Sequence, residues 1–145
     1  MPKVIKIKRF NKSLPLPEYK TGGAAGFDLY TRETVTIKPG ELALVPLNVA
    51  IEVPKGHVIL LIARSSTRKF GLTMINGVGV MDSDYIGDED EYHFSAQNFT
   101  KKTVTIEKGT RIAQGVLIKY ERAKWREVAN LGNKTRGGFG STGHR

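Results

Sequence analysis

Apolar and polar residues alternate in several short stretches of this chain, a pattern typical of β-strands with one buried face. The apolar positions of the alternating stretches are Ile5/Ile7, Val35/Ile37, Leu42/Leu44, Leu47/Val49/Ile51/Val53 and Val104/Ile106. We predict that each stretch is a strand and that these residues face the core. No window carries the apolar stripe of a long helix. The best helical candidate is a single turn over 66–70, after the apolar run 58–62.

Turn-forming residues separate these stretches at short intervals. They are Pro39-Gly40, Pro54-Lys-Gly56, Asn76-Gly77 and Lys108-Gly109. Strands spaced in this way predict an all-β barrel or sandwich. The length of 145 residues fits one domain. We therefore expect a single β-domain over residues 1–130.

Residues 131–145 have a different composition. They carry cations, hydroxyl groups and one large aromatic, and five glycines, Gly132, Gly137, Gly138, Gly140 and Gly143. Glycines allow a backbone to approach a ligand closely, and the cations and hydroxyls suit phosphate oxygens. The spacing of Gly138, Gly140 and Gly143 fits the dinucleotide fingerprint in letters only, because no strand and helix can flank it. We predict a flexible phosphate-binding arm, for which a disordered terminus is the alternative.

Charge and composition narrow the classes of partner. The formal net charge of +9, from 23 Lys and Arg against 14 Asp and Glu, favours an anionic ligand. The cations are scattered, and one Trp gives little support to a barrel that binds single-stranded nucleic acid. The absence of cysteine excludes disulfides and Cys-ligated zinc. With no signal peptide or membrane span in the pattern, we expect a cytoplasmic protein without a stable nucleic-acid or membrane partner.

Five segments are richer in Gly, Asp, Ser, Arg and Gln than strands require. They are Ala25-Gly-Phe-Asp-Leu29, Ala63-Arg-Ser-Ser66, Asn76-Gly-Val-Gly-Val-Met-Asp-Ser-Asp-Tyr85, Arg111-Ile-Ala-Gln114 and the arm. Together they resemble, in order and spacing, the five motifs of the trimeric dUTPases. The resemblance implies a jelly-roll-like distorted barrel of the β-clip type, assembled as a homotrimer in which the arm closes over a neighbouring subunit's active site. It also implies hydrolysis of dUTP to dUMP and pyrophosphate, which keeps uracil out of DNA and supplies dUMP for thymidylate synthesis.

Asp82 is the candidate catalytic residue. In the dUTPase family the residue that matches Asp82 activates the water that attacks the α-phosphorus. A carboxylate held by a tight hairpin suits that role. An isolated Asp82-Ser-Asp84 would more often be a turn that binds its own backbone. The motif around these residues favours the catalytic interpretation.

The segment from Asn76 to Tyr85 is the candidate nucleoside site. An amide such as that of Asn76 can complement the N3–H donor and O4 acceptor of uracil, although Asn-Gly alone is also a strong hairpin signal. By resemblance Tyr85 packs under the deoxyribose and leaves no room for a 2′-hydroxyl. The remaining substrate-binding candidates of this hairpin are Gly79, Val80 and Met81.

Phosphate contacts are expected from three other segments. The resemblance assigns them to Arg64, Ser65 and Gln114, together with Ser66, which stands where glycine is usual. Ser65 and Ser66 could instead cap a short helix, and Arg64 could pair with a carboxylate as scaffolding. Asp28 is expected to support Mg²⁺ indirectly, through water, with the ion held mainly by substrate phosphates.

The arm is expected to cover the substrate. By resemblance Phe139 stacks on the base, and Lys134 or Arg136 binds the γ-phosphate; the sequence leaves that choice open. The other substrate-binding candidates in the arm are Gly140, Ser141 and Thr142.

Some sequence features point to no further site. His57, His93 and His144 lack metal-ligand spacing, and we interpret the acidic segment 88–91 as a solvated loop. Two related functions stay as alternatives, a dCTP deaminase-like enzyme and a nucleotide-binding regulatory trimer with a protein partner. The complete arm and the Asp82-to-Tyr85 segment favour the hydrolase over the deaminase.

Overall fold

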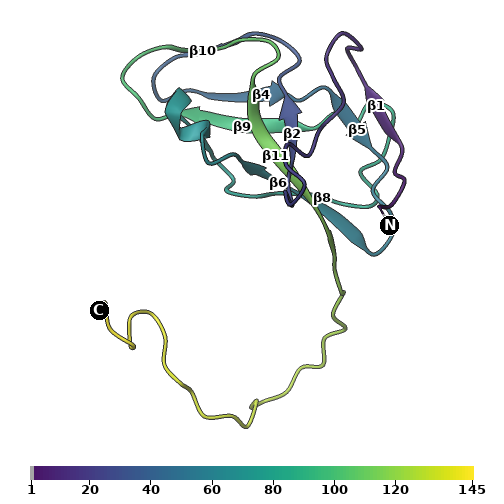
Figure 1. Cartoon of the computed structure of the whole chain (residues 1–145). Coiled ribbons are helices and arrows are strands. Elements are labelled where there is room, and N and C mark those ends of the chain that lie inside the picture. Colours follow the sequence, from purple (N-terminus) through teal and green to yellow (C-terminus); the bar gives the residue numbers. More distant parts are fainter. Residues whose placement is uncertain (1) are drawn as a thin grey trace.

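The computed structural model describes residues 2–145, and its regular structure is almost entirely β (Figure 1). In chain order the elements are β1 (Ile7–Arg9), β2 (Phe27–Tyr30), β3 (Val35–Ile37), β4 (Leu42–Pro46), β5 (Val49–Ile51), β6 (His57–Ala63), the 3₁₀ turn η1 (Thr67–Phe70), β7 (Leu72–Met74), β8 (Gly79–Met81), β9 (His93–Asn98), β10 (Val104–Ile106) and β11 (Arg111–Lys119). The single predicted helical turn is confirmed and begins one residue later than expected.

The strands of the described chain pair antiparallel in four sheets. The largest has the order β2-β11-β6-β8, a second has the order β4-β9-β7, and β1-β5 and β10-β3 are two-stranded. These sheets enclose one core, whose largest fully buried side chains include Tyr92, Phe94, Leu29 and Ile37. The arrangement is the expected all-β, jelly-roll-like domain, built from separate sheets that do not close into one barrel.

The long strand β11 fixes the relative positions of β2 and β6. It lies between them, with Gln114 opposite Asp28 on one side and opposite Ile62 on the other. Gly115 makes this packing possible, because a Cβ atom there would lie 2.5 Å from the ring of Phe27. Segments that are far apart in sequence therefore meet at one end of this sheet.

The predicted core faces hold for most strands but are wrong for β4. Leu47, Val49, Ile51 and Val53 are all buried, whereas Leu42 and Leu44 are 60% and 69% exposed. All four residues 42–45 are apolar, so the sequence does not show which parity faces inward. The structure buries the other face, with Val45 fully inside the core.

The Asn76-Gly77 turn is not the β-hairpin that we predicted. Gly77 adopts a φ of +71° and donates its N–H to the Met74 carbonyl at 3.0 Å, so a tight turn does form. The strands on its two sides belong to different sheets, because β7 pairs with β9 and β8 pairs with β6. Burial of Leu72 and Met74 in the core draws β7 away from β8.

The acidic segment 88–91 is also not wholly the solvated loop that we predicted. Asp88 and Glu89 are exposed, but Glu91 is 6% exposed and forms an ion pair with Arg32, with 2.7 Å between Oε2 and Nε. A buried carboxylate is expected to be paired in this way. Charge composition alone could not reveal the pair, since the two residues are far apart in the sequence.

Every residue from Glu121 to the C-terminus is exposed. In Figure 1 this segment leaves the end of β11 and arcs away from the sheets. Its hydrogen bonds, such as Ser141 N–H to the Gly138 carbonyl at 3.2 Å, are local turns. The domain boundary at residue 130 stays a prediction. No helix within residues 2–145 is long and apolar enough to cross a membrane.

Asn48 connects the N-terminal segment to the core. We expect Asn48→Ala to lower the free energy of unfolding by about 2–4 kcal/mol. Its φ is +74°, its Oδ1 accepts the Asn11 N–H at 2.6 Å, and its Nδ2 donates to the Asn11 carbonyl at 3.0 Å. Alanine loses both bonds and is strained at this φ. The measurement is urea unfolding at one fixed protein concentration.

Asn48→Gly is the matched control for this prediction. Glycine loses the same side-chain bonds but adopts a positive φ without strain, so its loss of stability should be smaller than that of alanine. An alanine variant as stable as the unmodified protein would contradict the structural role of Asn48.

Candidate active site

Three of the predicted motifs meet in a cavity of about 400 Å³ at the ends of β2, β6 and β11. We call it the cationic cleft; its polar lining is Lys20, Thr21, Asp28, Arg64, Ser65 and Gln114. The pairing of β11 with both β2 and β6 brings these residues together. Two cations, two hydroxyls and an amide around one carboxylate form an environment suited to a phosphate chain.

Asp28 pairs with two arginines, Arg64 of the cleft lining and the neighbouring Arg111. Its side chain is 10% exposed; Oδ1 lies 3.2 Å from Arg64 Nε, and Oδ2 accepts a hydrogen bond from Arg111 Nη1 at 2.8 Å. Arg64 also donates from Nη1 to the Arg111 carbonyl at 3.0 Å. Arg64 therefore does pair with a carboxylate, as the scaffolding alternative predicted. The ion pair also fixes the direction in which the guanidinium group points.

The serines after β6 are free of the capping role considered as their alternative. Ser66 occupies the N-cap position of η1 but makes no side-chain cap hydrogen bond. The buried hydroxyl of Thr67 takes the structural role, accepting the Arg64 N–H at 2.9 Å and donating to the Ile112 carbonyl at 2.6 Å. Ser65 is exposed at the wall of the cleft.

Gln114 lines the same cleft as Ser65. Its Nε2 donates to the Ala63 carbonyl at 3.2 Å. Gly26 gives the side chain its space, because a Cβ atom on Gly26 would collide with the Gln114 amide oxygen. The amide is therefore held against the last residue of β6.

Asp82 lies in a different part of the molecule. It follows β8 and begins a turn over residues 82–85, in which Tyr85 N–H donates to the Asp82 carbonyl at 3.1 Å; we call this the carboxylate turn. Asp82, Ser83 and Asp84 line a second cavity of about 400 Å³ with Tyr120 and Arg122. The turn ends the strand geometry that would have pointed the two Asp side chains the same way.

The predicted nucleoside residues lie on β8 and in the turns before and after it. Asn76 is exposed, and its Nδ2 donates to the Val78 carbonyl at 3.3 Å. Gly79 packs on Leu61, Val80 is 60% exposed, and Met81 is half-buried. Tyr85 is 37% exposed, and its ring stacks on that of Tyr92 with 6.4 Å between centroids.

The cationic cleft and the carboxylate turn are far apart within one chain. Met81 pairs with Ile59 on β6, whereas Arg64 comes five positions beyond Ile59, just after the other end of the strand. At about 3.3 Å per residue, this separation is about 16 Å. One copy of the chain therefore does not bring Asp82 to Arg64. The arm candidates Lys134, Arg136, Phe139, Gly140, Ser141 and Thr142 are exposed and line neither cavity.

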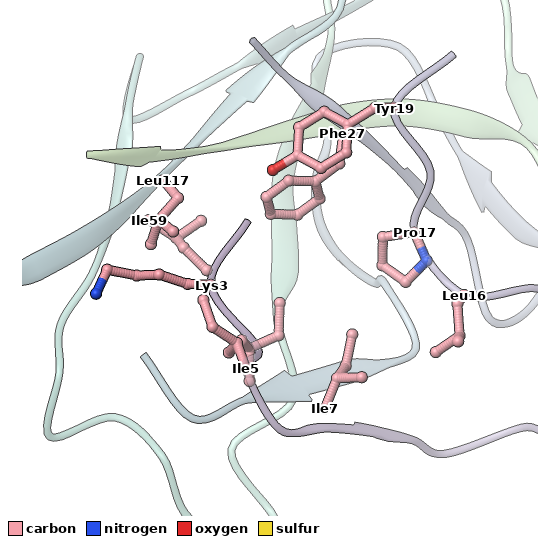
Figure 2. Close-up of a pocket in the computed structure, with 10 residues that line it drawn as sticks. Lys3, Ile5, Ile7, Leu16, Pro17, Tyr19, Phe27, Ile59 and Leu117 are labelled. Carbon is pink, nitrogen blue, oxygen red and sulfur yellow. The ribbon is translucent and has the colours of Figure 1, made fainter. Parts of the chain in front are cut away.

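A third hollow has apolar walls (Figure 2). Figure 2 shows the rings of Tyr19 and Phe27 edge to face above Ile5 and Ile7, and the centroids of the two rings are 5.7 Å apart. Lys3 is the one charged residue of its lining among the described residues. This hollow offers none of the carboxylate, guanidinium or side-chain amide groups of the candidate site.

Sequence reasoning missed several residues around the two halves. Arg111 begins the motif that ends at Gln114, but its pairing with Asp28 depends on the register of β11 against β2. Lys20 and Thr21 precede the motif that begins at Ala25, and Tyr120 and Arg122 follow the last strand. A basic or hydroxyl residue close to a motif was the available signal, and the scattered cations of this chain concealed it.

The fold and the site define an all-β protein with a cationic cleft and a separate carboxylate turn. The family model for dUTPase matches residues 12–143. The chain therefore belongs to the dUTPase family.

Individual relatives agree with this assignment over nearly their whole length. The deoxyuridine 5′-triphosphate nucleotidohydrolase of Finegoldia magna is 42% identical, covering 97% of this chain and 100% of the relative. The enzyme of the same description from Caldanaerobacter subterraneus is 43% identical, covering 97% of each.

Solved structures agree as well. The dUTPase from Streptococcus mutans has a TM-score of 0.75 and 35% identity, covering 82% of this chain and 98% of that one. The dUTPase of Staphylococcus bacteriophage 80alpha with dUPNHPP has a TM-score of 0.86 and 25% identity, covering 99% of this chain and 100% of that one.

Proposed function

We propose that this protein hydrolyses dUTP to dUMP and pyrophosphate, and so keeps uracil out of DNA and supplies dUMP for thymidylate synthesis. The observation that carries the proposal is the cationic cleft, in which Asp28 orients Arg64 beside Ser65 and Gln114. Such a cleft suits a triphosphate. The relatives that match the chain along its length are named as hydrolases of deoxyuridine 5′-triphosphate.

In the proposed reaction Asp82 is the general base. Its carboxylate accepts a proton from a water molecule, and the water oxygen forms a bond to the α-phosphorus. The bond between the α-phosphorus and the α,β-bridging oxygen breaks, and pyrophosphate leaves with that electron pair. Asp82 then returns the proton to solvent.

The segment from Asn76 to Tyr85 would select the nucleoside. The Asn76 amide complements the N3–H and O4 groups of uracil, and Gly79, Val80 and Met81 form the surrounding backbone. Cytosine presents the reverse hydrogen-bonding pattern and would leave these groups unpaired. Tyr85 would pack beneath the deoxyribose where a 2′-hydroxyl needs space.

The chain would use Mg²⁺ that arrives with the substrate. Among residues 2–145, no group of three or more His, Asp or Glu side chains could cage a metal ion, and the Asp28 oxygens contact Arg64 and Arg111. This donor set fits an ion held by phosphate oxygens and water, with Asp28 acting at most through water. Bound Mg²⁺ would neutralise charge on the triphosphate.

A homotrimer would complete the site. A general base must come within hydrogen-bonding distance of its water, and in one chain about 16 Å along β6 separates the position paired with Met81 from Arg64. A second copy can place its own carboxylate turn at the cleft. The exposed Leu42, Leu44 and Trp125, the last 90% exposed, offer apolar surface for contacts between copies.

The arm of another copy would then close over the substrate. Phe139 can stack on the base, while Lys134 or Arg136 binds the γ-phosphate and Ser141 and Thr142 cover the remaining oxygens. The glycines around them, including Gly140, allow the close approach. Closure would exclude water other than the nucleophile.

The proposal is tested by incubating the protein with dUTP, dCTP, dTTP or UTP in Mg²⁺ buffer and measuring pyrophosphate. We expect kcat/KM for dUTP to exceed that of each other nucleotide by at least about 100-fold, because mismatched partners leave buried polar groups unpaired. Equal rates for the four nucleotides would contradict the function. Ammonia release from dCTP would identify the deaminase alternative.

A further inference from the structure

The loop that joins Tyr85 to β9 is held by one contact to β1 and by one within the loop itself. Lys8 Nζ of β1 donates to the Asp88 carbonyl at 2.8 Å, and the Asp90 carboxylate accepts the Gly87 N–H at 2.8 Å. At its far end the loop enters the core through Glu91. Its position is therefore specified by defined contacts.

Glu91 makes the most buried of these contacts. Its side chain is 7% exposed, and it accepts hydrogen bonds from Arg32 Nε at 2.7 Å and Arg32 Nη2 at 3.0 Å. This is the bidentate geometry in which arginine binds a carboxylate most specifically. The hydrogen bond to Glu91 raises the pKa of Arg32, so the guanidinium group stays charged. The Asn48 N–H also donates to Glu91 Oε2, at 2.9 Å.

Tyr85 is oriented by contacts with Glu91 and with the next residue, Tyr92. Its hydroxyl donates to the Glu91 carbonyl at 3.1 Å, and its ring stacks on Tyr92 at an interplanar angle of 26°. Tyr92 is fully buried, and its N–H donates to the Val49 carbonyl at 2.8 Å. Burial raises the pKa of the Tyr85 phenol, so it stays protonated as a donor.

We propose that the Arg32–Glu91 ion pair is a positioning device for Tyr85, and that it thereby sets how strongly the site rejects ribonucleotides. The inference rests on the proposed role of Tyr85 beneath the deoxyribose. An aromatic ring excludes a hydroxyl only while it is held against the sugar, and a displacement of about 1 Å can change a rate by about 100-fold. Neither Arg32 nor Glu91 lines the cationic cleft or the cavity at the carboxylate turn.

The test compares kcat/KM for dUTP with that for UTP in the full-length protein. We expect Glu91→Ala to lower the dUTP/UTP ratio by about tenfold, mainly by raising the rate with UTP, since a loosened ring leaves space for the 2′-hydroxyl. Glu91→Gln keeps an acceptor for Arg32 and Asn48 and should retain most of the ratio. A purely structural role would lower the activity on both nucleotides together and leave the ratio unchanged.

Asn98→Ala is the matched control. Asn98 is fully buried at the other end of β9 and donates from Nδ2 to the carbonyls of Ile37 and Lys102 at 2.9 and 2.7 Å. Its loss should lower the midpoint of thermal unfolding and leave the dUTP/UTP ratio within about twofold of the unmodified protein, because distant sites act independently. An equal fall of the ratio in Asn98→Ala and Glu91→Ala would overturn the proposal.

Tyr85→Phe closes the test even if Glu91→Ala fails to fold. It removes only the hydroxyl that binds the Glu91 carbonyl, so it should lower the ratio, and Arg32→Lys, which loses the bidentate geometry, should lower it less. Adding Arg32→Lys to Tyr85→Phe should change the ratio by less than about twofold, since coupled residues are not additive. Unchanged ratios in both single variants would overturn the positioning role while leaving selective dUTP hydrolysis by the unmodified protein intact. Absence of dUTP selectivity in the unmodified protein would overturn both proposals.

Discussion

Asp82→Asn is expected to lower kcat for dUTP by about 10²–10⁴-fold and to leave nucleotide binding nearly unchanged. The amide has almost the same shape as the carboxylate but cannot accept the proton of the attacking water. Because Asp82 lies on an exposed turn, the exchange should not disturb the core. Pyrophosphate release measures kcat, and isothermal titration with a non-hydrolysable dUTP analogue measures binding.

Asp84→Asn is the matched control for Asp82→Asn. Asp84 lies in the same carboxylate turn, lines the same cavity and is also exposed, so the variant makes the same change of charge two residues away. We expect it to keep most of the turnover. Undiminished turnover in Asp82→Asn, or equal losses in the two variants, would remove Asp82 from the role of general base.

Deleting residues 132–145 is expected to reduce kcat/KM for dUTP by about 100-fold, since an arm that no longer closes leaves the substrate open to solvent and poorly aligned. The deletion should not change the thermal unfolding midpoint, because the deleted residues are exposed and hydrogen-bond only locally. Differential scanning calorimetry and steady-state kinetics on the same preparation separate the two effects.

Point variants in the arm divide the loss among its residues. Phe139→Ala should lower kcat/KM for dUTP nearly as much as the deletion does, because stacking on the base fixes the arm over the nucleoside. Comparing Lys134→Ala with Arg136→Ala identifies the residue that binds the γ-phosphate, through the larger rise in KM. Full activity in the deletion variant would contradict a catalytic arm.

Much of the fold could be predicted from the sequence, because strand alternation and turn residues act locally. The strands at 35–37, 49–51 and 104–106 follow directly from alternation. The failures arose where tertiary pairing decides. The parity of β4 cannot be read from four consecutive apolar residues, and the Asn76-Gly77 turn joins strands of two different sheets.

The candidate site divides in the same way. The motifs around Asp28, Arg64 and Gln114 were expected to act together, and the register of β11 does bring them into one cleft. The Asp28–Arg111 and Arg32–Glu91 pairs were not predicted, because each joins residues far apart in sequence. The distance of Asp82 from the cleft follows from strand register, which residue types alone do not specify.

Water is expected to attack the α-phosphorus of dUTP in preference to that of dCTP, dTTP or UTP. The most direct test runs the four-nucleotide incubation in H₂¹⁸O and locates the label in the products by mass spectrometry. We predict that dUTP is consumed first, with ¹⁸O in dUMP and none in pyrophosphate, since the bond that forms is to the α-phosphorus. Label in pyrophosphate or inorganic phosphate, or equal consumption of all four nucleotides, would contradict the account.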